Sequence, residues 1–248
     1  MIAILSPAKS LDYETERSLP PATKPRLTER TAQLVERGKE MSVEDLMSKM
    51  KISQSLAELN HGRWQGFEEQ DEKPAIQVFD GDVYTGLDAA SMDESDILFA
   101  QIHLRILSGL YGVLRPLDLM RPYRLEMGTK RFPEDKKLSI WWENAVADLL
   151  VEDMDLNGDR TILNLASEEY YASIKGRLPA DVRVIDVKFM TGDRFITMHA
   201  KVARGTMARW MIDNRVTNAE DLKGFDYDGY VYDAEASEGD ELVFRKAA

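Results

Sequence analysis

The stretch IAILSPAKS, residues 2–10, has a pattern that recurs twice in the chain. An aliphatic run ends at a polar residue and small residues follow, as also in RILSGLYG (105–112) and TILNLASEEY (161–170). Such runs predict short buried β-strands that end in polar loops. Because ligands of α/β proteins bind at the carboxyl ends of strands, the three stretches predict one shared site. The alternative is three unrelated strand-to-loop junctions.

Helical sequence separates these strands. We expect helices within 26–41 (N-cap Thr28), 41–67 (two helices, capped at Ser42 and Ser53), 94–105 and 138–153. Residues 181–213 predict two strands about a Thr-Gly-Asp turn and then a helix, and residues 229–246 predict a last hairpin. The chain shows no repeat and no linker. We therefore predict one compact mixed α/β (α+β) domain over residues 1–248, with a mixed central sheet and surrounding helices.

The composition excludes several classes of site. The chain has 248 residues, no cysteine and only three histidines, so disulfides and thiolate metal sites are excluded and no metal or cofactor is expected. The N-terminus lacks the pattern of a signal peptide and no apolar run of about 18 residues occurs, which predicts a cytoplasmic protein without a membrane span. We also favour a monomer. The net charge of -12 opposes non-specific coating of nucleic acid and leaves room only for a local basic cleft.

The most informative stretch is RILSGLYGVLRPLDLMRPYRLEMGTK, residues 105–130, which is basic, aromatic and rich in turn residues. Its glycines, Gly109 and Gly112, permit close backbone approach. Its arginines offer forked donors for phosphate, and its tyrosines offer faces on which bases stack. The stretch predicts binding of a polyanion or a nucleotide, with a solvated charged face as the alternative. The candidates are Arg115, Arg121, Arg124, Lys130, Tyr111 and Tyr123.

A second basic run, HAKVARGTMARWM, covers residues 199–211. Lys201 and Arg204 are three residues apart and share a helix face, whereas Arg209 need not. With Lys188 on the preceding strand they predict an extension of the same positive surface. The alternative is a helix with one basic side and a core stripe of methionine and tryptophan.

Polar residues at the strand ends complete the candidate site. Lys9 can meet a phosphate or carboxylate as a point charge. Asp80 and Asp82 are two residues apart, so in an extended stretch their side chains would face the same side. Such a pair could bind a divalent cation or act as a general acid/base pair. The alternative is that Asp-Gly-Asp forms an ordinary turn. No established catalytic constellation is present, so enzymatic activity is left open. The pocket-lining candidates are Ser6, Asp12, Asp80, Asp82, Tyr84, Ser108, Tyr111, Tyr123, Asn164 and Ser167.

Five motifs, SPAKSLD, GDVYTGL, LRILSGLYGVLRPLDLMRPYRLEMGTK, NLASEEY and AKVARGTMARW, closely resemble the bacterial YaaA (UPF0246-type) peroxide-stress-resistance family, essentially end to end. The resemblance implies a cytoplasmic protein that limits hydrogen peroxide damage and is connected with lower free iron. It also implies a single-domain α/β fold that binds DNA through a positively charged cleft with a helix-hairpin-helix element. That element maps to residues 42–64, with its hairpin near 49–53. The segment lacks the Gly-x-Gly hairpin, so a plain helical pair serving the core is the alternative.

Three functions follow from these patterns. The first is a DNA-binding protein of the oxidative-stress response. The alternative is an enzyme acting on a nucleotide or nucleobase in a strand-end pocket, with Lys9, Asp80, Tyr111 and Asn164 as polar groups. The third is an interaction protein that recruits a partner through the acidic residues 235–241. A direct iron site is not favoured, because cysteine is absent and histidines are few.

Overall fold

The computed structural model describes residues 1–248 and is built on a seven-stranded sheet of order β10-β11-β9-β8-β1-β5-β6. The five inner strands are parallel and both edge strands are antiparallel to their neighbours. This confirms the predicted mixed α/β fold. All four residues of β1 are buried, as expected of a parallel strand covered on both faces. The strands are β1 (Ile2–Leu5), β5 (Leu104–Ser108), β6 (Gly112–Leu114), β8 (Thr161–Leu165), β9 (Arg183–Thr191), β10 (Val231–Tyr232) and β11 (Glu241–Lys246).

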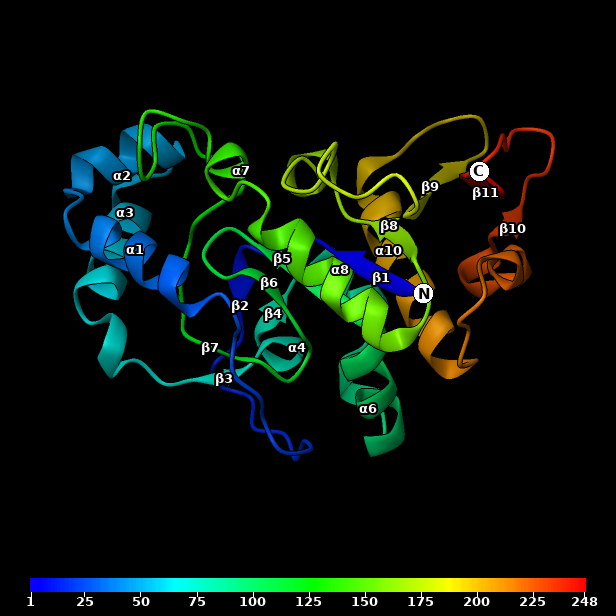
Figure 1. The fold of residues 1–248 in the computed structure, drawn as a ribbon, viewed down its shortest axis with the longest axis horizontal. Coiled ribbons are helices and arrows are strands. Elements are labelled where there is room, and N and C mark those ends of the chain that lie inside the picture. Colours follow the sequence, from blue (N-terminus) through cyan, green and yellow to red (C-terminus); the bar gives the residue numbers. More distant parts are fainter.

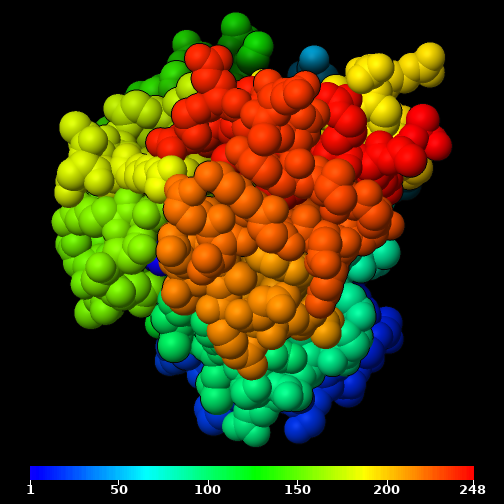
Figure 2. Space-filling model, turned by 90° about the vertical axis from the view of Figure 1, so that its right-hand side faces the viewer, coloured from blue at the N-terminus to red at the C-terminus, as the bar shows by residue number.

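Helices pack against the sheet. Figure 1 shows α8 (Ala145–Asn157) in front of the sheet and α10 (Thr197–Asp213) behind it. The helix α6 (Glu94–His103) contacts β1, β5 and α10. From α10 onward the chain covers one end of the molecule, which Figure 2 shows in orange and red. No helix is long and apolar enough to cross a membrane.

Three helices lie together at the other end (Figure 1). They are α1 (Thr28–Lys39), α2 (Val43–Met50) and α3 (Gln54–Gln65). Ser42 forms a capping box with Asp45 at the start of α2, and the Ser53 hydroxyl accepts a hydrogen bond from the backbone N–H of Leu56 at the start of α3. Both predicted caps are confirmed. The cap predicted at Thr28 is wrong by one residue, because Leu27 occupies that position without a side-chain hydrogen bond.

Two further expectations are corrected. Residues 138–153 form two helices, α7 (Leu138–Trp141) and the first part of α8, rather than one. The second strand expected after the turn at 191–193 does not form, and the chain enters α10 after an isolated bridge between Thr191 and Arg194. The reason is that β9 already pairs with β8 on one side and β11 on the other, which leaves no free edge for a hairpin strand. The last hairpin, β10–β11, is confirmed.

Short elements connect these layers. Two small antiparallel pairs join β2 to β4 and β3 to β7. The short strands are β2 (Ser10–Leu11), β3 (Lys73–Pro74), β4 (Phe79–Asp80) and β7 (Leu119–Met120), and the short helices are α4 (Ala75–Val78), α5 (Asp82–Leu87) and α9 (Glu168–Tyr171). Four 3-10 turns occupy Phe67–Glu69, Ala89–Ser91, Ala219–Gly224 and Tyr227–Gly229.

Candidate nucleic-acid interface

The strand ends predicted to build a site are neighbours in the sheet, since β1 lies between β5 and β8. The Ser6 hydroxyl donates to the hydroxyl of Ser167 (3.2 Å) and accepts from the backbone N–H of Ser167 (2.9 Å). The Tyr84 hydroxyl donates to the backbone carbonyl of Ser6 (3.0 Å). These bonds fix the loops that follow β1 and β8 against each other.

The two tyrosines of the central stretch lie in the core. Tyr111 and Tyr123 pack edge to face, and the hydroxyl of Tyr123 is hydrogen-bonded to that of Ser108 (2.7 Å). Both rings are buried, and burial raises the pKa of the Tyr123 hydroxyl. Neither ring therefore presents a face on which a base could stack. A Cβ at Gly109 would overlap the carbonyl of Leu125, so the expected close backbone approach is present.

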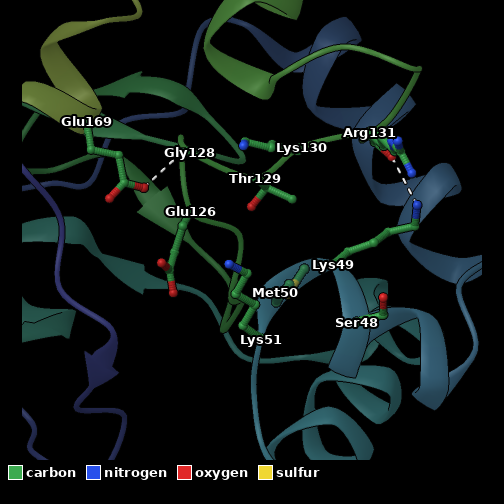
Figure 3. Close-up of a pocket in the computed structure, with 10 residues that line it drawn as sticks. All are labelled: Ser48, Lys49, Met50, Lys51, Glu126, Gly128, Thr129, Lys130, Arg131 and Glu169. Carbon is green, nitrogen blue, oxygen red and sulfur yellow. Dashed lines mark hydrogen bonds between the residues drawn. The ribbon is translucent and has the colours of Figure 1, made fainter.

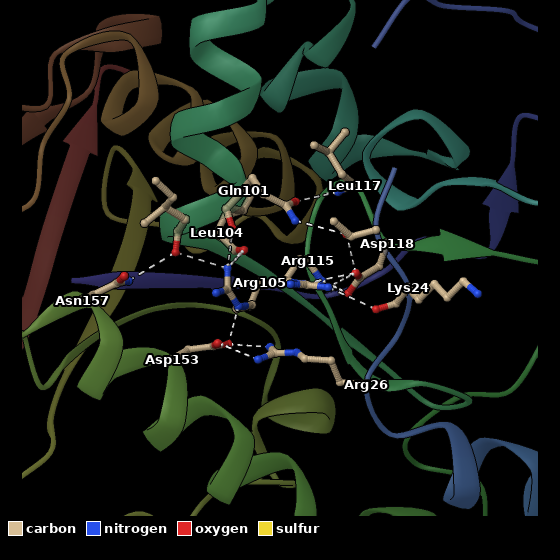
Figure 4. Close-up of polar contacts among 12 residues, drawn as sticks. Lys24, Arg26, Gln101, Leu104, Arg105, Arg115, Leu117, Asp118, Asp153 and Asn157 are labelled. Carbon is tan, nitrogen blue, oxygen red and sulfur yellow. Dashed lines mark hydrogen bonds and ion pairs between the residues drawn. The ribbon is translucent and has the colours of Figure 1, made fainter. Parts of the chain in front are cut away.

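Several candidate arginines are held by carboxylates of the chain itself. Arg115 donates twice to Asp118 and once to the carbonyl of Lys24, as Figure 4 shows. Arg121 pairs with Glu72 at 2.6 Å. Arg209 pairs with Asp213 and also donates to the carbonyl of Asp88. These guanidinium groups hold loops and helices together.

Four further charged candidates divide into two groups. Lys188 pairs with Glu241, and Lys201 pairs with Asp82. Lys130 and Arg204 form no ion pair. Arg204 is largely buried, and this burial lowers the pKa of its guanidinium.

The acidic and amide candidates have local structural roles. The chain turns at Gly81 from β4 into α5, so Asp80 and Asp82 do not share one extended stretch, which corrects that expectation. The Asp12 carboxylate accepts hydrogen bonds from two backbone N–H groups in the following turn. Asn164 donates to Asp186 and accepts from the backbone N–H of Ala166. No group of three or more His, Asp or Glu side chains is placed to hold a metal ion.

A basic cleft of about 510 Å³ lies between the α2–α3 turn and the loop that ends the central stretch. Figure 3 shows Lys49 and Lys51 on one wall and Lys130 and Arg131 on another. Lys51 adopts a left-handed backbone conformation (φ 52°) at the end of α2. The Nζ atom of Lys49 donates to the carbonyl of Arg131 (3.2 Å). We call these four residues the basic cleft.

The two acids that line this cleft have other partners. Glu126 is paired with Lys9 and Arg124, and Glu169 accepts a hydrogen bond from the backbone N–H of Gly128 (2.8 Å). None of the three cleft lysines forms an ion pair. Arg131 is paired with Asp135 (3.4 Å) and Glu169 keeps its negative charge, so the surplus of positive charge in the cleft comes from the three lysines.

A family model described as "Peroxide stress protein YaaA" matches residues 1–236. The chain belongs to this family. It is also 47% identical to a UPF0246 protein of Rhizorhabdus wittichii, over 99% of each chain. The resemblance recognised in the sequence is thus confirmed, and the family name places the chain among proteins of the peroxide stress response.

Within this YaaA-family chain, sequence reasoning missed Lys49, Lys51 and Arg131 as charges of one site. The expected helical hairpin at residues 42–64 was the signal that could have identified Lys49 and Lys51, because both lie at its turn. The structure confirms two helices joined by a short turn there, capped at Ser42 and Ser53. That this pair acts as a DNA-binding helix-hairpin-helix stays a prediction.

Proposed function

We propose that this member of the YaaA family binds double-stranded DNA through its basic cleft during hydrogen peroxide stress, as a cytoplasmic monomer. One observation carries the proposal. Three lysines without ion-pair partners, Lys49, Lys51 and Lys130, converge on one cleft of a protein whose net charge is -12. Lysines at a protein surface that share a concave site attract phosphate, and neutralising phosphates releases counterions from the duplex.

The distribution of charge supports a confined contact. Most other candidate cations are neutralised inside the chain, such as Arg115 by Asp118 and Lys188 by Glu241. The acidic remainder of the surface repels a phosphate backbone. A duplex would therefore meet the protein where three unpaired lysines gather, at the α2–α3 turn and the loop opposite it.

The contacts available in the cleft suit the backbone of DNA rather than its bases. Lysine is a flexible point charge that binds phosphate without reading sequence. The two buried tyrosines of the central stretch, Tyr111 and Tyr123, cannot act as stacking platforms. We therefore propose binding that is salt-dependent and independent of sequence.

Binding of this kind can limit peroxide damage. Ferrous iron bound to DNA reduces hydrogen peroxide to hydroxide and a hydroxyl radical, and is itself oxidised to ferric iron beside the strand. Lysines that neutralise phosphates displace the condensed cations, ferrous iron included. The protein should then reduce nicking of plasmid DNA by ferrous iron and hydrogen peroxide. A variant in which glutamine replaces the three cleft lysines should protect the plasmid less.

The experiment measures affinity for a fluorescent duplex by anisotropy at low salt. The variant Lys49→Gln/Lys51→Gln/Lys130→Gln should weaken binding by at least about tenfold, because three phosphate contacts are lost. Arg194→Gln is the control, since it removes one exposed charge that has no side-chain hydrogen bond or ion pair. Equal affinity of the cleft variant and the wild type would refute the proposal.

A further inference from the structure

Thr129 lines the basic cleft and has a hydroxyl group that the chain does not use. Only 5% of the residue is exposed, and the part that is exposed faces the cleft. The side chain makes no hydrogen bond within the chain, and Figure 3 shows the hydroxyl directed into the cleft. A nearly buried hydroxyl without an acceptor is costly. The cleft therefore contains a neutral donor that a bound group can satisfy.

The next residue supplies a second free donor. Lys130 faces Lys137 in an isolated antiparallel bridge, and the residues on either side of the pair make the backbone hydrogen bonds. In such a non-hydrogen-bonded pair the N–H of Lys130 points away from its partner, and it has no acceptor in the chain. One residue before Thr129, the N–H of Gly128 is already taken by the carboxylate of Glu169 (2.8 Å). The free donors of this loop are therefore adjacent in sequence, at Thr129 and Lys130.

The oxygens of a phosphate group suit these donors. In complexes with DNA, phosphate oxygens accept hydrogen bonds from threonine hydroxyls and backbone N–H groups as well as from lysines. A hydrogen bond from a neutral donor to an oxyanion is also stronger than one between two neutral groups. The three lysines of the cleft, which form no ion pair, favour an anion over a neutral acceptor at this place.

We infer that the hydroxyl of Thr129 and the backbone N–H of Lys130 form a subsite that binds a non-bridging oxygen of one backbone phosphate of DNA. The inference rests on the proposed binding of DNA and goes beyond it. Lysines attract any phosphate that comes near, whereas two short neutral donors on the backbone of one loop fix the position of a single phosphate. Thr129 is thus a positioning residue for the strand that the lysines attract.

The test measures the affinity of wild type and Thr129→Val for a fluorescent duplex by anisotropy over a range of salt concentrations. Valine keeps the branched shape of threonine and removes only the hydroxyl, so affinity should fall by about tenfold. The dependence of affinity on salt should keep the slope of the wild type, because a neutral donor releases no counterions. Thr129→Ser keeps the hydroxyl and should bind DNA nearly as well as the wild type.

Two controls separate binding from folding. Since the Thr129 hydroxyl has no partner in the chain, Thr129→Val should unfold at the same urea concentration as the wild type. Thr31→Val is the matched control, because Thr31 is also buried (8% exposed) but does not line the cleft, and its hydroxyl donates to the carbonyl of Leu110 (3.1 Å). This variant should lose stability with that hydrogen bond and keep the affinity of the wild type for DNA.

Equal affinity of wild type and Thr129→Val at every salt concentration would overturn the inference, as would equal losses in Thr129→Val and Thr129→Ser. A shallower salt slope in Thr129→Val would also overturn it, since the valine would then have acted by displacing lysines. Failure of the proposed function gives a different result. If substitution of the three lysines weakens binding and Thr129→Val does not, only the subsite is wrong, whereas absence of duplex binding by the wild type would overturn both.

Discussion

At the scale of single residues, Asp153 is the most consequential charge in the core. Its carboxylate accepts two hydrogen bonds from Arg26 (2.7 and 2.6 Å) and one from Arg105 (2.6 Å), as Figure 4 shows. Burial alone would raise the pKa of Asp153, but the two arginines outweigh it and the pKa is lowered. The carboxylate therefore stays ionised and joins α8 to β5 and to the loop before α1.

The first prediction concerns this carboxylate. Asp153→Asn should lower the free energy of unfolding by about 3–5 kcal/mol, since it leaves Arg105, only 4% exposed, without its counter-charge. Urea denaturation measures the change. The control Asp148→Asn alters an exposed carboxylate of the same helix and should cost about 1 kcal/mol or less. Similar losses in the two variants would contradict this account.

The second prediction concerns pH and His103. The Nδ1 atom of its ring lies 2.9 Å from the carbonyl of Met1, and burial lowers the pKa of the ring below its ordinary value despite this contact. A lowered folded-state pKa means that the unfolded chain binds the proton more tightly. The contribution of neutral His103 to stability is thus complete above about pH 6.5 and is lost as the pH falls below it.

Urea denaturation at several pH values between 5 and 7.5 tests this prediction. The free energy of unfolding should decrease toward pH 5 in the wild type, and His103→Asn should reduce that pH dependence. Identical slopes in wild type and variant would show that His103 does not contribute.

At the scale of elements, the crossing of α5 and α10 depends on two glycines. A Cβ on Gly205 would overlap the carbonyl of Val83, and a Cβ on Gly86 would overlap the carbonyl of Val202. Both clashes are with backbone atoms, which no side-chain rotation relieves. The close approach of the two helices places Asp82, at the start of α5, beside Lys201.

The third prediction follows from that crossing. Gly205→Ala should destabilise the protein by about 1–3 kcal/mol or more, because the helices must move apart. Gly62→Ala is the matched control, since Gly62 lies within α3 with no atom within 4 Å of an added Cβ. The control should be neutral or stabilising by up to about 1 kcal/mol, because alanine favours the helix. Melting temperatures of both variants decide the matter, and a stable Gly205→Ala would contradict the structure.

Local sequence patterns predicted the helices and strands better than they predicted which strands pair and which residues contact each other. The aliphatic runs that became β1, β5 and β8, and the caps at Ser42 and Ser53, are encoded within a few residues and were predicted correctly. The prediction of a second strand after β9 was wrong. Only the order of the sheet shows that both edges of β9 are already paired.

The candidate site was harder to predict for the same reason. The sequence shows that Arg121 and Lys201 are charged, but their partners Glu72 and Asp82 are distant in the chain. A pairing across such a separation cannot be read from spacing. The lysines and arginines that form no ion pair matter most for binding. They can be identified only when the positions of all carboxylates in the folded protein are known.

At the scale of the whole molecule, unpaired positive charge is concentrated in one cleft. The protein is acidic overall, with a net charge of -12, and ion pairs neutralise many of its arginines. One cleft, at the end of the molecule that carries α1–α3, holds three lysines that form no ion pair: Lys49, Lys51 and Lys130. Long-range repulsion from the rest of the surface should keep affinity for DNA modest and confined to this cleft.

The most direct test is the salt dependence of duplex binding in wild type and in Lys49→Gln/Lys51→Gln/Lys130→Gln. The logarithm of the binding constant should fall linearly with the logarithm of salt concentration, with a slope set by the phosphates contacted. The slope of the variant should be shallower by about 2.7, or about 0.9 for each lysine lost. Binding by the wild type with the same slope as the variant, or no binding at low salt, would contradict the central claim.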